Sequence, residues 1–514
     1  MKRVLCLLLS VIMVIGLCAC GGGDAYVPTG DALYRDEDYT GPTATKPREE
    51  TEQSLVLTYY PDRSMNPLLC ADYTNRTLFS LMYQSLFTVD RDYVQEPQLC
   101  KSYRVSEDMR TYTFYVENAA FWDGTPLTAA DVLVSLTAAR ESDYYKGRFL
   151  HIADMTLSAD GGVVLTLTTP FENLPLLLDI PILKQSEVSA QYPVGTGPYA
   201  LDVSAQTPIL RRNINWWCKA ELVVTAPAIT LIPAESPAGI RDDFEFSGLS
   251  LVCADPGSDR YADYRCDYEL WDCENNIFLY LSCNMASEVF SVPEVRSALT
   301  FAIDRDGIVE EFYRGFARSA SLPASPLSPN YSQVLAEKYV YNGGKGLAQA
   351  VTDAALNDKP VILLVNKDDS LRMRVARSIG KTLRAAGLDV QMQELSGNAY
   401  MKALRERAYD LYLGQTKLSA NMDLTPFFSD NGALNYGSIG EVGLYTLCTE
   451  AFANHGNYYT LHQKVMDDGR LVPILFRSYA VYATRGLLTE LAPTRDNVFY
   501  YSLGKTMEKA LIKE

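Results

Sequence analysis

The chain has 514 residues, a hydrophobic content of 47%, a charged content of 21% and a formal net charge of −17. This composition is that of a folded globular protein, and the length suggests two or three domains rather than one core. The acidic balance argues against nucleic-acid binding, which favours a basic surface. It also argues against attraction to anionic lipid through clustered basic side chains.

The first twenty residues predict export and a lipid anchor. Lys2 and Arg3 form a short positive start, and residues 4–16 are an apolar run typical of a cleaved signal peptide. The run is shorter than the ~20 apolar residues of a membrane-spanning helix. Residues 17–20 (Leu-Cys-Ala-Cys) resemble the bacterial lipobox, which implies cleavage before Cys20 and a diacylglycerol on its sulfur. The alternative is an ordinary cleaved signal with incidental cysteines.

Residues 21–53 are polar and rich in Pro, Gly, Thr, Asp and Glu, which predicts a flexible spacer. No later apolar run is long enough to span a bilayer, so we expect the rest to be soluble. The spacing of the remaining cysteines matches neither a CxxC pair nor a zinc pattern, and it leaves both disulfides and free thiols open. These cysteines are Cys70, Cys100, Cys218, Cys253, Cys266, Cys273, Cys283 and Cys448, of which Cys266 and Cys273 are the closest pair in sequence.

The first half of the chain predicts mainly strands and hairpins. The expected elements are a strand at residues 55–60, a helix within 77–86, a strand at 112–116, a helix over 129–140 and a hairpin of 155–157 with 163–167. Thr128 is suited to cap the second of these helices. Asp-Gly and Pro within residues 121–126 indicate a turn before it.

The later part of the chain alternates between strand and helix. The expected order is a strand at 361–365, a helix over 371–386 that stops at Gly387, a strand at 388–393, a helix over 400–407 and a strand at 410–413. Such alternation predicts parallel α/β units. No repeat of 20 to 50 residues is found, which argues against a solenoid.

Five separated segments carry a family pattern. The most specific is residues 121–132, FWDGTPLTAADV, preceded by Tyr-Thr-Phe at 112–114. The others are residues 64–67 with 81–86, 194–199 with 212–217, 293–305 with 313–315, and 387–390 with 409–410. In order and spacing they resemble the extracytoplasmic solute-binding protein family 5, the oligopeptide-, dipeptide- and nickel-binding components of ABC importers. The resemblance runs from about residue 55 to the C-terminus.

The resemblance implies an α/β fold of the large, three-domain periplasmic-binding-protein type (type II), with two lobes, mixed sheets and a hinge. The expected divisions are a signal peptide at 1–19, lipidated Cys20 and spacer at 20–53, a lobe 1 core of 54–85 with 190–268 and 483–514, an additional lobe 1 domain of 86–189, and lobe 2 at 269–482. Hinge closure then encloses the ligand, because the ligand binds the closed state better than the open one.

The same resemblance suggests that two loops, 69–74 and 414–423, face the cleft. The predicted ligand-binding residues are Asp72, Tyr73, Gln415, Thr416, Lys417 and Asp423. In peptide binders the second loop resembles GWxxDxxDP, with a Trp that packs on the ligand and an Asp that pairs with its amine. Here Gln415 or Thr416 stands at the Trp position, and Lys417, Leu418 or Ser419 stands near that Asp. This departure argues against ordinary peptide specificity, and Lys417 suggests an anionic group on the ligand, unless it is a solvated surface lysine.

Two other features have a structural interpretation. Residues 195–200 (Gly-Thr-Gly-Pro-Tyr-Ala) fit a dinucleotide-binding pattern, but Pro198 and a strand-like segment follow where that pattern needs a helix. We expect the glycines to allow backbone conformations closed to other residues. Arg296 and Asp304 are expected to start a helix or to join a partly buried network.

The sequence contains no known catalytic motif. His151, His455 and His462 form no HExxH, no G-x-S-x-G is present, and the two later histidines are expected on a surface or a helix. We therefore predict a binding protein without cofactor or metal, although nickel or haem uptake is a further branch of the family. The expected partners are a peptide or small solute, permease subunits and a membrane contacted through the lipid, and the protein is expected to be monomeric. A sensor lipoprotein and a secreted hydrolase are the alternatives. A lipid tether suits a Gram-positive cell.

Overall fold

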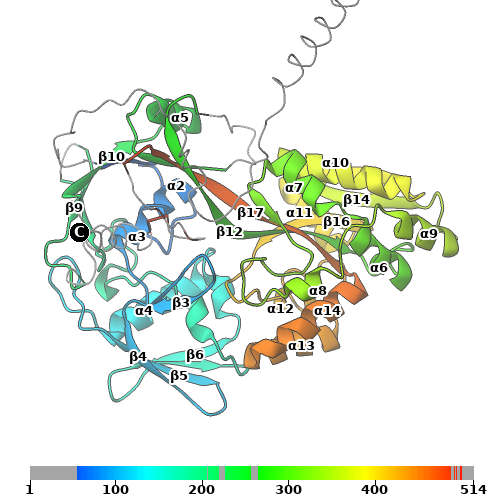
Figure 1. Ribbon diagram of the computed structural model, residues 1–514. Helices are drawn as coiled ribbons and strands as arrows, with labels where there is room; N and C mark the ends of the chain where they lie inside the picture. The colour runs from blue at the N-terminus through cyan, green and yellow to red at the C-terminus, as the bar shows by residue number, and fades with distance from the viewer. Residues whose placement is uncertain are drawn as a thin grey trace, which may run out of the picture.

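The computed structural model describes residues 55–204, 207–218, 226–255 and 264–487, with Leu491, Thr494, Val498 and Phe499 (Figure 1). The predicted signal peptide, the lipidation site Cys20 and the spacer lie outside the described residues. Among the helices that are described, none is long and apolar enough to cross a membrane.

The first sheet joins segments that are far apart in the sequence. Its strand order is β1-β10-β9-β8, and its strands are β1 (Leu55–Tyr59), β10 (Ala228–Pro233), β9 (Ile209–Arg212) and β8 (Tyr199–Asp202). Strand β1 runs parallel to β10, and the other pairs are antiparallel. Leu55, Leu57 and Tyr59 alternate along β1 and are buried, so one face of this sheet contributes to the main core.

A second four-stranded sheet lies within residues 100–167. It has the order β4-β5-β7-β6, with β4 (Cys100–Val105), β5 (Thr111–Val116), β7 (Val163–Leu167) and β6 (Ile152–Leu157). The predicted hairpin is confirmed, because Leu157 pairs with Val163. The predicted helix is α4 (Ala129–Glu141), which packs against β6 and β7. Thr128 and Asp131 form a reciprocal capping box at its start.

The largest sheet has seven strands and lies toward the C-terminal part of the chain. Its order is β11-β17-β12-β16-β14-β15, with β13 paired to β17, and the strands are β11 (Leu251–Ala254), β17 (Leu471–Thr484), β12 (Tyr268–Cys283), β16 (Leu411–Lys417), β14 (Pro360–Asn366), β15 (Asp389–Leu395) and β13 (Ala317–Ser319). The predicted parallel pairing is present between β14 and both β15 and β16. The long antiparallel strands β12 and β17 were not predicted, and in Figure 1 they run side by side through the middle of the molecule.

Helices surround these sheets. Helix α10 (Ser370–Ala385) packs on β14 and β15, and Gly387 follows its end with a φ of +95°. The remaining helices are α2 (Tyr73–Arg76), α3 (Phe79–Met82), α5 (Pro237–Glu245), α6 (Pro293–Ala302), α7 (Arg305–Tyr313), α8 (Gln333–Ala336), α9 (Lys345–Asp353), α11 (Gly397–Glu406), α12 (Thr425–Phe428), α13 (Val442–Ala453) and α14 (Tyr458–Asp468). The chain also forms a short hairpin of β2 (Phe87–Val89) and β3 (Gln95–Pro97). Among its 3₁₀ turns are η1 (Lys146–Phe149) and η2 (Leu174–Leu177).

The helix expected within residues 77–86 is wrong in length. Only Phe79–Met82 is helical, because Tyr83 is already extended (φ −125°, ψ 146°) and Ser85 pairs with Pro181 in a β-bridge. The apolar side chains at 81, 82 and 86 are all buried, so the apolar spacing correctly predicted which side chains are buried. Tertiary pairing decided the backbone conformation instead of the local pattern.

The role of Gly195 and Gly197 differs from the expected one. Neither has a positive φ; instead, a Cβ at Gly195 would lie 2.2 Å from the carbonyl oxygen of Met82, and one at Gly197 would lie 2.5 Å from the Met82 carbonyl carbon. The backbone of Gly197 also donates a 2.9 Å hydrogen bond to the Met82 oxygen. These glycines are therefore required for close contact between two chain segments.

Arg296 and Asp304 have the predicted scaffold roles. Asp304 caps α7 by accepting from the backbone N–H of Gly307 at 3.0 Å. Arg296 is buried and donates to the carbonyl oxygens of Phe290, Ser291 and Asp468. The eight cysteines left open by the sequence are present as thiols, most of them buried.

Candidate ligand-binding site

A cavity of about 290 Å³ lies where α2 and the segment after α4 face strands β12, β16 and β17. Its lining residues are Ala71, Tyr73, Arg76, Tyr144, Asn275, Ile277, Gln415, Thr416, Lys417 and Tyr479. Four of the six sequence-predicted residues, Tyr73, Gln415, Thr416 and Lys417, are among them. The mixed polar and apolar lining of the cavity is typical of a small-molecule site, and its volume is at the lower end of the usual range.

Strand β16 places Gln415, Thr416 and Lys417 in the lining of the cavity. The sequence pattern ended this strand at residue 413, but it continues to Lys417, where it pairs with Ile277 of β12. Three of the expected loop residues are therefore held in a sheet, and a rigid strand places their side chains more firmly than a loop would. Gly414 directly precedes them because a Cβ there would lie 2.4 Å from the ring of Tyr280.

Strand β12 carries an irregularity beside the cavity. Its register with β17 shifts between Glu274 and Phe278, and Asn276 adopts a left-handed conformation with a φ of 58°. Asn276 is held there by donating to the carbonyl oxygen of Leu418 at 3.2 Å and by accepting a hydrogen bond from the phenol of Tyr93. Asn tolerates this conformation better than most residues. The bulge is therefore stabilised by specific contacts of Asn276, and it takes the neighbouring residue, Asn275, out of the regular strand pairing.

The displaced neighbour, Asn275, has an unused hydrogen-bond donor. Its Oδ1 accepts from the backbone N–H of Ile277 at 3.0 Å, while its Nδ2 has no partner among the described residues. The residue is only 1% exposed and lines the cavity. A buried donor left unpaired costs about 1–3 kcal/mol, so a ligand that supplies an acceptor would recover that free energy.

Two cations meet the ring of Tyr144. The guanidinium carbon of Arg76 lies 3.3 Å from the ring centroid, and Nζ of Lys417 lies 4.6 Å from it. Lys417 also donates to the Tyr144 hydroxyl at 2.6 Å. Arg76 is buried and fixed by the carbonyl oxygens of Pro67 and Cys70, whereas Lys417 is exposed at the mouth of the cavity. The aromatic ring offsets part of the cost of bringing two positive charges together.

Two further tyrosines of the lining pack on each other. The rings of Tyr73 and Tyr479 lie 4.0 Å apart between centroids, and burial raises the pKa of both phenols, that of Tyr479 to about 12. Both are therefore neutral hydrogen-bonding groups at physiological pH. Gln415 is oriented by Arg477, which donates to its Oε1 at 3.1 Å and pairs with Asp255 at 2.6 Å.

Among the described residues, the lining thus contains an arginine and a lysine and no carboxylate. Together with the unused Asn275 donor, this arrangement suits a ligand group that is anionic and accepts hydrogen bonds. No group of three or more His, Cys, Asp or Glu side chains able to hold a metal occurs in the described part of the chain.

Asp72 and Asp423 do not line this cavity. Asp72 caps α2, where its Oδ1 accepts from the backbone N–H of Asn75 at 3.1 Å. Asp423 is buried, with Oδ2 2.9 Å from Nε2 of His151 and Oδ1 accepting from the N–H of Thr425 at 2.7 Å. Both carboxylates therefore have structural partners, and a ligand contact for either stays a prediction.

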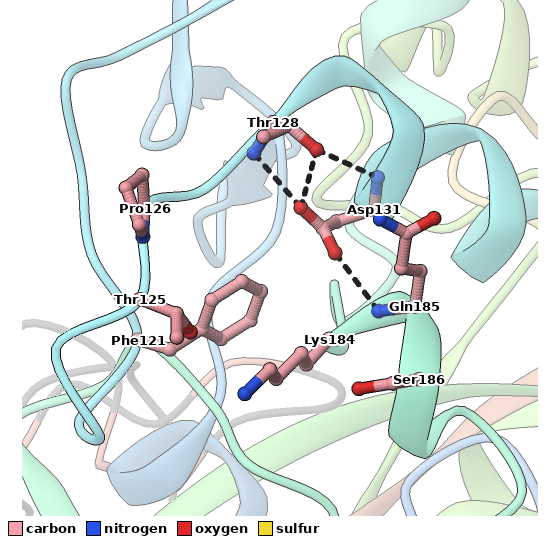
Figure 2. Close-up of a pocket in the computed structure, with 8 residues that line it drawn as sticks. All are labelled: Phe121, Thr125, Pro126, Thr128, Asp131, Lys184, Gln185 and Ser186. Carbon is pink, nitrogen blue, oxygen red and sulfur yellow. Dashed lines mark hydrogen bonds between the residues drawn. The ribbon is translucent and has the colours of Figure 1, made fainter.

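The segment that carries the most specific sequence pattern surrounds a different pocket, shown in Figure 2. There the Asp131 carboxylate accepts from the N–H and hydroxyl of Thr128 and, at 2.8 Å, from the N–H of Gln185. Lys184 pairs with Asp123 at 2.5 Å. Because these polar groups satisfy one another, the segment joins α4 to the chain after residue 183 and acts as scaffold.

Sequence reasoning missed Arg76, Tyr144, Asn275 and Tyr479. A signal existed for one of them, because asparagine is uncommon in strands, and two consecutive asparagines just before the apolar run at residues 277–281 favour a bulge. The other three are ordinary residues of their segments, and only the fold brings them together.

These features define a mixed α/β protein with a small polar and aromatic cavity lined by distant chain segments. The chain belongs to the bacterial extracellular solute-binding proteins, family 5, since the family's middle-region model matches residues 95–435. This membership confirms the predicted class, a binding protein rather than an enzyme. The glutathione-binding protein GsiB of Escherichia coli (strain K12) is 27% identical over 285 residues, which are 50% of this chain and 53% of GsiB. The chain thus spans about half the length of the curated relatives it matches.

Solved structures give the same fold. CtaP, an ABC transporter substrate binding protein from Listeria monocytogenes, superposes with a TM-score of 0.72 at 17% identity, over 88% of this chain and 98% of CtaP. NikA from Brucella suis, in complex with Fe(III)-EDTA, superposes with a TM-score of 0.70 at 16% identity, over 87% of this chain and 99% of NikA. The predicted fold class, the two-lobed periplasmic-binding-protein type with mixed sheets, is confirmed.

Proposed function

We propose that the protein is the substrate-binding component of an ABC importer, which captures a small solute by hinge closure and delivers it to a permease. The observation that carries this proposal is the cavity bounded by Arg76, Lys417 and the unused donor of Asn275. Residues from α2, β12, β16 and β17 converge there, as expected for a ligand enclosed between lobes. The relatives named for glutathione and the transporter structures agree with such a role.

The ligand we propose is a peptide or peptide-sized solute with an anionic group. That group would lie near Lys417 and Arg76 and would accept a hydrogen bond from Asn275. Tyr73 and Tyr479 would pack on the adjacent part of the ligand, since tyrosine combines a flat apolar ring with a polar tip. Gln415 and Thr416 would supply the polar contacts that orient it.

The proposal includes the lipid on Cys20 and the lobe boundaries predicted from the sequence. A diacylglycerol anchor on the outer face of the cytoplasmic membrane would keep the loaded protein close to its permease. The polar spacer up to residue 53 would give it reach. This arrangement suits a Gram-positive cell, which has no outer membrane to retain a released binding protein.

Native mass spectrometry of the full chain, purified without added ligand, tests the function. We expect a co-purified small molecule that carries a carboxylate or another anionic group. A thermal-shift screen of di- and tripeptides follows, because a ligand at 100 times its dissociation constant adds ~2.7 kcal/mol to stability. The Asn275→Asp variant, which removes the donor at nearly constant size, should respond less. No bound molecule and no response to any acidic peptide would exclude this function.

A further inference from the structure

A second cavity, of about 310 Å³, borders the segment that follows β16. Residues of the small hairpin and of β4 and the segment at 171–176 form one part of the lining. Residues 328–330, 420–421 and 451–458 form the other. The first cavity is bounded by residues 415–417 and this one by 420–421, so the same stretch of chain borders both.

Four of the buried lining residues are aromatic. Tyr93, Phe171, Phe452 and Tyr458 are each at least nine-tenths buried, and the ring centroids of Phe171 and Phe452 lie 5.3 Å apart. Tyr103 is partly exposed at the edge. No arginine or lysine lines the cavity among the described residues, in contrast to the first one. Such walls favour an uncharged, flat group over an anion.

One buried polar side chain in this cavity has an unused donor. Asn421 is 4% exposed, and its Nδ2 has no hydrogen-bond partner within the described part of the chain. The rest of the residue is fixed, because its Oδ1 accepts from Ser419 at 2.6 Å and its carbonyl oxygen accepts from Asn330 and Tyr458. Leaving this donor buried is costly unless something supplies an acceptor.

The entrance is more polar than the interior. Glu172 and His455 line the cavity and are exposed, while Asn173 donates to Gln95 at 3.3 Å. A polar rim around an apolar interior that contains one convergent donor is the usual composition of a small-molecule site. The size suits one ring or one large side chain rather than a whole peptide.

We propose that this second cavity binds an uncharged aromatic group that carries a hydrogen-bond acceptor, which Asn421 Nδ2 contacts. The aromatic walls enclose the ring, and the acceptor, such as an amide carbonyl, pairs with the asparagine. The group belongs either to a separate small molecule or to the distal part of the ligand held in the first cavity. Asn421 lies four positions after Lys417, so at most about 14 Å of extended chain lies between them, a distance that a short peptide spans.

The test uses the full chain and N-acetyl-L-phenylalanine amide as the probe, with N-acetylglycine amide as a comparison that has the acceptors but no ring. Saturation-transfer NMR should show saturable binding of the phenylalanine probe, at least tenfold stronger than that of the glycine probe. Asn421→Asp should weaken it about fivefold to tenfold, because the carboxylate cannot donate. Asn342→Asp adds the same charge at an exposed site and should leave binding unchanged.

A second probe, succinyl-Gly-Gly-Phe-amide, distinguishes the two sources of the aromatic group. If one ligand occupies both cavities, this anionic probe binds more tightly than N-acetyl-L-phenylalanine amide, and both Lys417→Glu and Asn421→Asp weaken it. If a separate molecule binds, Asn421→Asp alone weakens it. Equal binding of the phenylalanine and glycine probes, or wild-type affinity in an Asn421→Asp variant with unchanged melting temperature, would overturn the proposal.

Discussion

Nζ of Lys417 lies 2.6 Å from the hydroxyl oxygen of Tyr144, although 273 positions separate the two residues in the chain. The contact joins strand β16 to the segment between α4 and η1, and Arg76 packs on the same ring. Residues from three distant segments thereby form one positively charged wall. The charge of the ligand is the property that this wall should control.

We therefore expect Lys417→Glu to weaken binding of an acidic ligand by about tenfold, because an attraction at the cavity mouth becomes a repulsion. The loss should shrink in high salt, since Lys417 is exposed and its field is screened. Isothermal titration calorimetry with the co-purified ligand, at low and high ionic strength, measures both effects. Lys367→Glu changes the same charge on an exposed turn and is the control. Equal affinity in both variants would show that Lys417 does not select the ligand.

Asp423 should matter for stability rather than for affinity. Asp423→Ala removes the closer of two partners of the buried His151 Nε2, the other being the Thr425 hydroxyl at 3.3 Å, and the acceptor of the Thr425 N–H. The expected cost is about 2 kcal/mol in the free energy of unfolding. Urea denaturation measures this loss. Asp389→Ala, at an exposed position of β15, should change stability by less than about 0.5 kcal/mol. If Asp423→Ala instead abolished ligand binding and left the free energy of unfolding unchanged, the ligand contact predicted for Asp423 from the sequence would be supported.

Gly195→Ala should prevent normal folding or destabilise the protein by about 3 kcal/mol. The new Cβ would lie 2.2 Å from the Met82 carbonyl oxygen, and backbone atoms on both sides must move to relieve the contact. Gly147→Ala is a matched control, because a Cβ there meets nothing within 4 Å and its φ is ordinary. That variant should be unchanged or slightly more stable. Soluble yield and urea midpoints compare the two, and similar values would contradict the close packing.

His462 should make the protein less stable in mild acid. It lies fully buried on α14 with neither ring nitrogen hydrogen-bonded among the described residues, and burial lowers its pKa to about 3. Below pH ~6.5 the His462 imidazole is protonated in the unfolded chain but stays neutral in the native state. The free energy of unfolding therefore falls by up to ~1.4 kcal/mol per pH unit as the pH is lowered, until about pH 3.

Urea unfolding at pH 7 and pH 5.5 checks this effect. His462→Phe should lose about 1 kcal/mol less than the wild type over that interval, whereas His455→Phe, at an exposed position, should follow the wild type. An unchanged pH dependence in His462→Phe would mean that the imidazole is solvated or paired. His462 lies on α14 and His455 is exposed, so the expectation of a surface or helix position is confirmed for both.

The sequence predicted the elements in which local signals agree with tertiary structure. Thr128 and Asp131 fix the start of α4, and Gly387 marks the end of α10, so both helices were found with nearly correct limits. Strands β12 and β17 were missed, because long, mostly buried strands have no clear alternation. The cavity was predicted in part through family resemblance, which pointed to Tyr73 and Lys417. Arg76 and Tyr144 could not be predicted, since their roles depend on chain segments that meet only in the fold.

In the bulge of β12, two adjacent asparagines have different structural roles. Asn276 maintains the backbone, whereas Asn275 gives the cavity an unused Nδ2 donor while its Oδ1 accepts from the N–H of Ile277. A change at position 275 that keeps this acceptor, such as Asn275→Asp, would therefore alter what the cavity accepts while the N–H of Ile277 keeps its partner. Selection for a changed ligand should therefore begin with substitutions at position 275 that retain an acceptor, while position 276 is left as asparagine.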